Sequence, residues 1–187
     1  MKNVFRILFL FLLSHTGFAQ VDYLGLQSIT FEDETYELKW SAYIDRTKVM
    51  EEYTLPEESN TRYTTKFIVE FTRNDFESVT EAKWDELTYE KQEGRVLNCR
   101  NAGDPDSDEV VYEFMIGNVR NGETISVEWN VYRYRQKPDG AVILFAMSKR
   151  AYESKNISSF MEEMNKERLN WINSVINYQL PEIPARK

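Results

Sequence analysis

Strict alternation of apolar and polar residues marks the most strongly patterned segment of the chain, residues 123–135. Every second position there shares one face of a predicted β-strand: Ile125, Val127, Trp129 and Val131. Similar alternation, or a short apolar run between turn residues, predicts strands at 34–44, 61–72, 95–100, 109–118 and 141–148. Segment 20–33 is expected to lead into the first strand. Segment 45–60 is expected to be a charged loop with a short helical turn near 49–53.

Two further segments repeat their apolar residues at helical spacing. In the first, Ser78 and Glu81 have the spacing of a capping box, and Gly94 stands where a helix ends. The second is a C-terminal helix of about 20 residues with a cap expected at Ser159. Its apolar stripe is interrupted only by Arg168. The pattern therefore predicts an α+β fold: a single antiparallel β-sheet of about five to seven strands with about two packed helices, the last C-terminal.

The N-terminus has the three parts of a cleavable signal peptide over residues 1–19. Lys2 and Arg6 precede an apolar run over 7–13, and Gly17 and Ala19 place small side chains before a cut at Gln20. A membrane-spanning helix needs roughly 20 apolar residues, so this run is too short to be one. No cysteine follows it that a lipid could modify. We therefore expect one soluble domain over residues 20–187, periplasmic or secreted, with no membrane span.

Cleavage would remove the only histidine of the chain, His15, and two of its positive charges. The remaining domain would carry a net charge of about −10, because the whole chain carries −8. Loss of imidazole excludes histidine-based catalysis and most zinc sites. The acidic balance argues against nucleic-acid partners. The single cysteine, Cys99, allows no internal disulfide and is expected to be a small buried apolar residue.

The polar face of strand 123–135 is the first candidate for a binding site. It presents a row of acidic, amide and phenolic side chains: Glu128, Asn130, Tyr132 and Tyr134. Such a row suits the lining of a ligand cleft. The same pattern also fits a surface on which a helix packs, or an exposed sheet face stabilised by cross-strand pairs.

A second candidate is the loop that contains Asp104, Asp106 and Asp108, since alternate carboxylates on a tight loop suit a calcium ion. An EF-hand would need glycine in place of Glu109 and glutamate in place of Met115, so that motif is absent. The alternative is a solvated acidic loop.

The strings Glu128–Arg135 and Ala141–Tyr152 resemble small exported proteins of uncharacterised function from Bacteroidetes-type bacteria. The similarity extends over residues 34–155 and implies an envelope location without assigning site residues. The order of the predicted elements also resembles the PsbP-like α/β sandwich. That resemblance implies a binding or assembly role, although fold does not fix function.

Three functions follow from these observations. The leading hypothesis is a non-catalytic envelope domain that binds another envelope protein or a small ligand and needs no cofactor. One alternative is a carboxylate-dependent hydrolase of cell-wall or glycan material, in which Glu128 faces a second acid. The other is a calcium-dependent binding module. No catalytic residue and no metal ligand is assigned.

Overall fold

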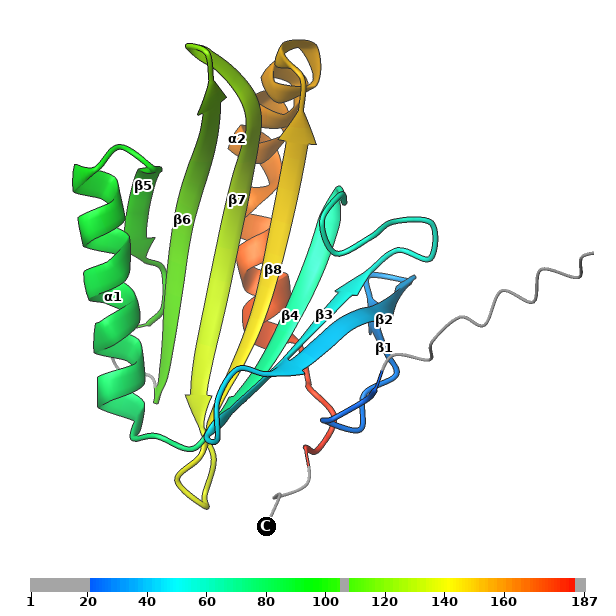
Figure 1. Ribbon diagram of the computed structural model, residues 1–187, viewed down its shortest axis with the longest axis vertical. Helices are drawn as coiled ribbons and strands as arrows, with labels where there is room; N and C mark the ends of the chain where they lie inside the picture. Colours follow the sequence, from blue (N-terminus) through cyan, green and yellow to red (C-terminus); the bar gives the residue numbers. More distant parts are fainter. Residues whose placement is uncertain (1–20, 105–107, 184–187) are drawn as a thin grey trace, which may run out of the picture.

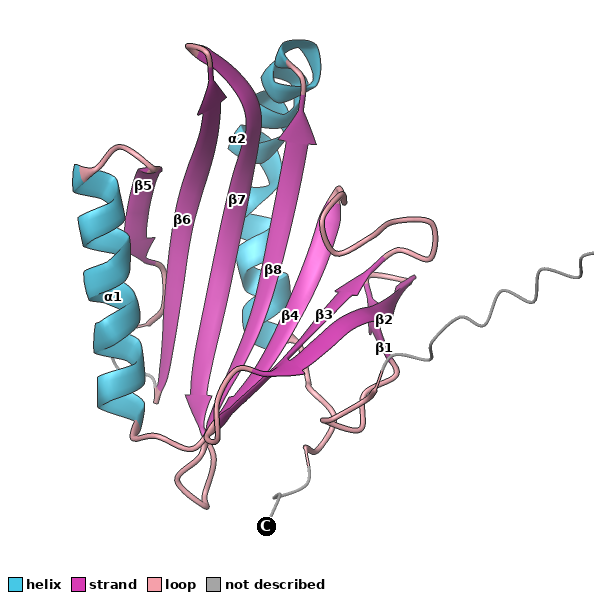
Figure 2. Cartoon of the chain, viewed as in Figure 1, coloured by secondary structure: helices cyan, strands magenta, loops and turns pink. Residues whose placement is uncertain are grey.

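A computed structural model describes residues 21–104 and 108–183 and shows one eight-stranded antiparallel sheet with a helix on each face (Figures 1 and 2). The proposed signal peptide and Asp106 of the acidic loop lie outside the described residues. The strands are β1 Ser28–Phe31, β2 Glu34–Tyr43, β3 Lys48–Thr54, β4 Thr65–Thr72, β5 Val96–Asn101, β6 Glu109–Arg120, β7 Glu123–Gln136 and β8 Val142–Tyr152. The helices are α1 Phe76–Gln92 and α2 Ser154–Asn177.

The spatial order of the strands is β1-β2-β3-β4-β8-β7-β6-β5, so β4 and β8 form the centre. Each strand is antiparallel to its neighbours. The α+β class, the single antiparallel sheet and the C-terminal helix are confirmed. The sheet has more strands than predicted, because β1 lies in the expected lead-in segment and β3 in the expected loop.

The sequence pattern misses β3 because a buried acid interrupts its apolar face. Val49 and Tyr53 are buried as a strand pattern requires, and Glu51 between them is fully buried as well. The Glu51 carboxylate accepts hydrogen bonds from the Tyr23 and Leu24 amides at 2.6 and 3.0 Å and from the Tyr53 hydroxyl at 2.6 Å. These bonds offset part of the cost of burying its charge, and they hold the segment before β1 against the sheet.

The helix ends differ from the predicted caps. Asp75 is the N-cap of α1, and its carboxylate accepts a hydrogen bond of 2.8 Å from the Ser78 amide. The helix therefore begins at Phe76, before the expected capping box. α2 begins at Ser154, ahead of Ser159. The predicted end of α1 is confirmed, since Gly94 follows the helix with a φ of 74°.

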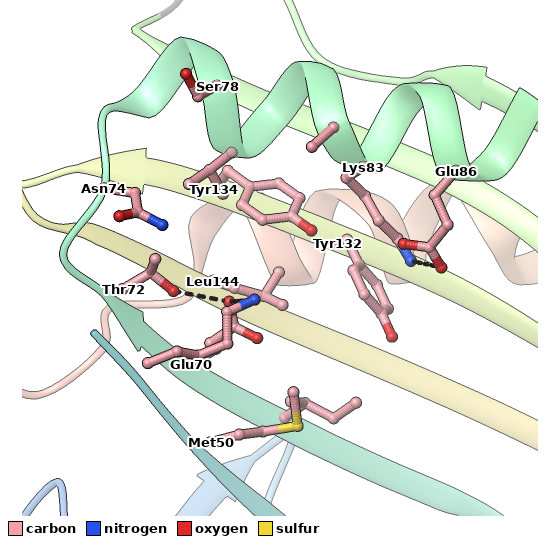
Figure 3. A pocket seen from close by; sticks show the side chains of 14 residues that line it. Met50, Glu70, Thr72, Asn74, Ser78, Lys83, Glu86, Tyr132, Tyr134 and Leu144 are labelled. Carbon is pink, nitrogen blue, oxygen red and sulfur yellow. Dashed lines mark hydrogen bonds and ion pairs between the residues drawn. The ribbon is translucent and has the colours of Figure 1, made fainter. Parts of the chain in front are cut away.

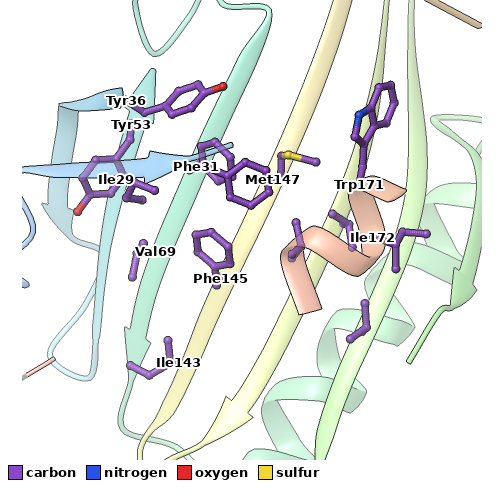
Figure 4. Packing of buried hydrophobic residues seen from close by; sticks show 14 of the residues in the cluster. Ile29, Phe31, Tyr36, Tyr53, Val69, Ile143, Phe145, Met147, Trp171 and Ile172 are labelled. Carbon is purple, nitrogen blue, oxygen red and sulfur yellow. The ribbon is translucent and has the colours of Figure 1, made fainter. Parts of the chain in front are cut away.

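The main hydrophobic core lies on the α2 face of the sheet (Figure 4). Phe145 of β8 stacks on Phe67 of β4 and on Tyr178, with ring centroids 5.5 and 4.6 Å apart. Trp129 of β7 meets Trp171 of α2 at 5.4 Å between ring centroids. The predicted core face of β7 is confirmed for Val127, Trp129 and Val131, which belong to the core that α2 covers. Ile125, near the start of the strand, is exposed instead.

Arg168, the polar interruption in the α2 stripe, has a partner in the sheet. Its Nε lies 3.7 Å from the carboxylate of Glu113, which also pairs with Arg100 and accepts a 2.7 Å hydrogen bond from Trp129 Nε1. The interruption is therefore an ion-pair position between α2 and the sheet.

A smaller cluster lies under α1 on the opposite face and includes Leu87, Phe114 and Tyr134. The hydroxyl of Tyr112 donates a 3.0 Å hydrogen bond to the Thr80 carbonyl of α1. α1 buries only Thr80 and Leu87. The helix therefore covers one side of this face and leaves the side over β3 and β4 open (Figure 1).

Candidate functional site

A groove of about 380 Å³ runs between α1 and the sheet (Figure 3). Its floor includes Tyr132 and Tyr134 from β7 and Leu144 from β8. One wall is α1, and the other is formed where the sheet continues through Glu70 of β4 to Met50 of β3. This volume lies within the range of roughly 300–1,000 Å³ that small-molecule sites occupy.

Tyr132 and Tyr134, two of the four predicted site residues, meet in this groove. Tyr134 is buried and Tyr132 is half-buried. In the described part of the chain neither hydroxyl makes a hydrogen bond, and Figure 3 shows both in the space between α1 and β4. Burial, together with nearby glutamates, raises the pKa of both phenols well above the ordinary value. Both hydroxyls therefore keep their protons at neutral pH and act as hydrogen-bond donors.

The charged side chains of the groove form pairs. Lys48 Nζ lies 3.1 Å from Oε1 of Glu70, which also accepts a 2.9 Å hydrogen bond from Thr72. Lys83 pairs with Glu86 at 2.9 Å on α1. The other oxygen of Glu70, Oε2, accepts no hydrogen bond within residues 21–104 and 108–183, and it is not one of the fully buried atoms that lack a partner there, so it is open to the groove. The groove thus presents the hydroxyls of Tyr132 and Tyr134 and Oε2 of Glu70, and the polar side chains of Asn74 and Ser78 also line it.

Glu128, the third predicted residue, lies outside the groove in a buried polar cluster. Its Oε2 accepts a 2.6 Å hydrogen bond from the Tyr63 hydroxyl and pairs closely with Arg150. Arg150 and Lys66 lie 4.4 and 4.6 Å from the Tyr63 ring centroid. Burial beside Glu128 raises the pKa of Tyr63. The described contacts of Glu128 include no second carboxylate, and its role here is structural.

Asn130, the fourth predicted residue, is 1% exposed and belongs to the same buried region. Its Oδ1 accepts a 2.6 Å hydrogen bond from Ser148, and its Nδ2 has no partner among the described residues. The predicted row therefore separates into two parts. Two tyrosines line the groove, whereas the carboxylate of Glu128 and the amide oxygen of Asn130 bond to residues outside it.

Sequence reasoning misses Lys48, Met50, Glu70 and Lys83 of the groove. Glu70 occupies the polar phase of the β4 alternation, where a surface residue is expected, so nothing in the pattern distinguishes it. Lys48 and Met50 belong to β3, which the pattern predicts to be a loop. Placing these residues opposite Tyr134 requires the β3-β4-β8-β7 order, which the local pattern does not reveal.

The other candidates gain no further support. Asp104 and Asp108 border residues that the structure does not describe, and residues 21–104 and 108–183 hold no group of three metal-ligating side chains. Cys99 is half-buried, less than the sequence predicts, and packs against the cluster under α1. Neither described helix has the length and apolar character that crossing a membrane requires.

Comparison with known proteins gives one match. A protein-family model matches residues 26–180, a range that includes every described strand and both described helices, and that family is uncharacterised. No curated protein and no solved structure matches the chain. The functional argument therefore depends on the geometry of the groove.

Proposed function

The chain belongs to an uncharacterised protein family, and we propose that it acts outside the cytoplasm as a non-catalytic domain that binds a small ligand in the groove beneath α1. Residues 1–19 support export, because they have the composition of a signal peptide. The resemblance of 34–155 to small exported bacterial proteins supports the same location.

The observation that carries the proposal is the convergence of polar groups without partners. The hydroxyls of Tyr132 and Tyr134 and Oε2 of Glu70 line one groove and make no hydrogen bond to described residues. None of the three belongs to the fully buried atoms that lack a hydrogen-bond partner in the described chain, so each is open to the groove and can reach a ligand there. A bound ligand would satisfy all three.

The contacts of the acids favour binding over hydrolysis. A glycoside hydrolase needs two carboxyl groups that face each other across the scissile bond. Glu128 instead forms an ion pair with Arg150 and a hydrogen bond with Tyr63. The two glutamates of the groove, Glu70 and Glu86, form ion pairs with Lys48 and Lys83. The calcium alternative depends on Asp106, outside the described residues, and stays a prediction.

A thermal-shift experiment tests the binding site. The small-molecule fraction of a native envelope extract should raise the melting temperature of the wild-type domain, because ligand binding stabilises the folded state. The double variant Tyr132→Phe/Tyr134→Phe should fold normally, since the lost hydroxyls have no described partner, and should lose the shift. Tyr112→Phe is the matched control, because its hydroxyl bonds Thr80 and does not line the groove. Equal shifts in the wild type and the double variant would contradict the proposed site.

A separate experiment tests export. Arginine in place of Leu10 interrupts the apolar run, and we expect the chain to stay in the cytoplasm with its N-terminus intact. N-terminal sequencing of the exported wild-type protein should begin at Gln20. An exported wild-type chain that still begins at Met1 would refute cleavage.

A further inference from the structure

We propose that the ligand of the groove is an uncharged saccharide, an inference that rests on the binding function proposed above. The first argument comes from charge. The lysines and glutamates that line the groove form two neutral pairs, Lys48 with Glu70 and Lys83 with Glu86. A charged ligand group would have to lose its hydration without meeting an unpaired opposite charge, which is costly. The groove therefore favours a ligand without net charge.

The second argument comes from hydrogen bonding. Tyr132 and Tyr134 offer donors, and Oε2 of Glu70 offers an acceptor. A ligand must therefore donate a hydrogen bond on the β4 side, and on the β7 side it can accept from the phenols or donate to them. A hydroxyl group does both, and a saccharide presents several hydroxyls on one rigid ring. Lys83 and Glu86 can each form further hydrogen bonds, so they could bind additional saccharide hydroxyls at the α1 wall.

The third argument distinguishes a saccharide from a peptide. The central floor strands β4, β8 and β7 each pair with a neighbour on both sides, so their backbone groups are already bonded. An extended peptide in the groove would have no strand edge on which to place its own N–H and C=O groups. A saccharide has no such backbone to satisfy.

The fourth argument comes from the apolar part of the groove. Leu144, Ile68 and Met50 lie among the polar groups, together with the rings of Tyr132 and Tyr134. A saccharide ring has an apolar C–H surface as well as its polar edge, so it can contact this floor while its hydroxyls reach the side chains around it.

An array of neutral, uronic-acid and amino-sugar oligosaccharides tests the ligand class. We expect the wild-type domain to bind at least one neutral member, with little change in affinity between about 50 and about 500 mM salt, since no net charge pairing contributes. Tyr132→Phe and Tyr134→Phe should each weaken binding about ten-fold, and Glu70→Ala by a similar factor. Glu70→Gln keeps an acceptor oxygen and should retain most of the affinity. Tyr112→Phe should bind as the wild type does.

The outcomes separate this inference from the proposed function. If no neutral saccharide binds, or if only charged members bind with a steep loss in salt, the saccharide class is wrong. The groove itself stands in that case if the extract still stabilises the wild type and not the double tyrosine variant. If a neutral saccharide binds the wild type and the double variant equally, the groove is not the site and both proposals fail.

Discussion

α1 and α2 lie on opposite faces of one sheet, yet α2 buries five side chains along its length and α1 buries two. On the α2 face, aromatic rings pack closely and the polar groups of Glu113 and Glu51 have partners. On the α1 face, two phenols and one carboxylate oxygen have no described partner beside an open groove. The comparison indicates that the α2 face holds most of the packed core, whereas the α1 face carries the groups of the proposed binding site.

Truncating a core ring should give the largest difference in unfolding free energy between the two faces of the sheet. Phe145→Ala removes a fully buried ring from the α2 face and should lower the free energy of unfolding by about 3–5 kcal/mol. Val79→Ala, on the half-covered α1 side, should cost about 1 kcal/mol or less. Urea unfolding monitored by tryptophan fluorescence measures both. Similar losses in the two variants would remove the distinction between the faces.

The second test concerns the buried acid of the α2 face. Glu113→Ala leaves Trp129 Nε1 without its acceptor and Arg168 without its carboxylate, so we expect a loss of about 2–4 kcal/mol. Glu113→Gln keeps an acceptor for the indole and should lose less. The same unfolding assay separates the two. An alanine variant as stable as the wild type would show that this network does not hold α2.

Two tyrosines on the α1 face test whether a bonded hydroxyl contributes more to stability than an unbonded one. Tyr112→Phe removes a hydroxyl bonded to Thr80 and should cost about 1 kcal/mol. Tyr134→Phe removes a hydroxyl with no described partner and should change stability by less than about 0.5 kcal/mol. Thermal and urea unfolding of the ligand-free proteins give both values. A larger loss in Tyr134→Phe would indicate that its hydroxyl is structural.

The smallest expected effect is a change in the free energy of unfolding with pH. Burial raises the pKa of Glu51 above the ordinary value of 4.5, although its hydrogen bonds oppose part of this shift. A carboxyl with a raised pKa in the folded state contributes stability below its ordinary pKa and loses it as the pH rises through the raised value. The wild type should therefore lose stability relative to Glu51→Gln as the pH rises from 4.5 towards neutral. Unfolding curves across this range measure the difference, and a constant difference would contradict the raised pKa.

Local alternation is sufficient to predict much of this molecule. It places Trp129 on the core face of β7, and Tyr132 and Tyr134 on the opposite face, as the structure confirms. Asn121 and Gly122 join β6 to β7, and both adopt the positive φ that a tight hairpin needs. Alternation fails at β3, where Glu51 lies in the core.

The site is predicted only in part, because it is assembled from distant segments. Tyr132 and Tyr134 share a strand face, so the pattern identifies them together. Glu70 joins them only because β4 pairs with β8, which pairs with β7. Glu128 and Asn130 have the same strand periodicity, yet Tyr63 and Ser148 bond to them. Periodicity shows which face a residue is on, and it does not show what covers that face.

The central position of β4 and β8 also bears on how the chain folds. Apart from this pair, each strand lies beside its neighbour in sequence, whereas Thr65 pairs with Lys149, 84 positions later. Closing so long a loop costs entropy before any contact compensates for it, and non-local pairing slows folding. A chain that has not yet added β8 has two further exposed strand edges, at β4 and β7, besides those of β1 and β5, and such edges favour aggregation. Rapid and productive folding of the whole protein therefore depends on the arrival of its last strand.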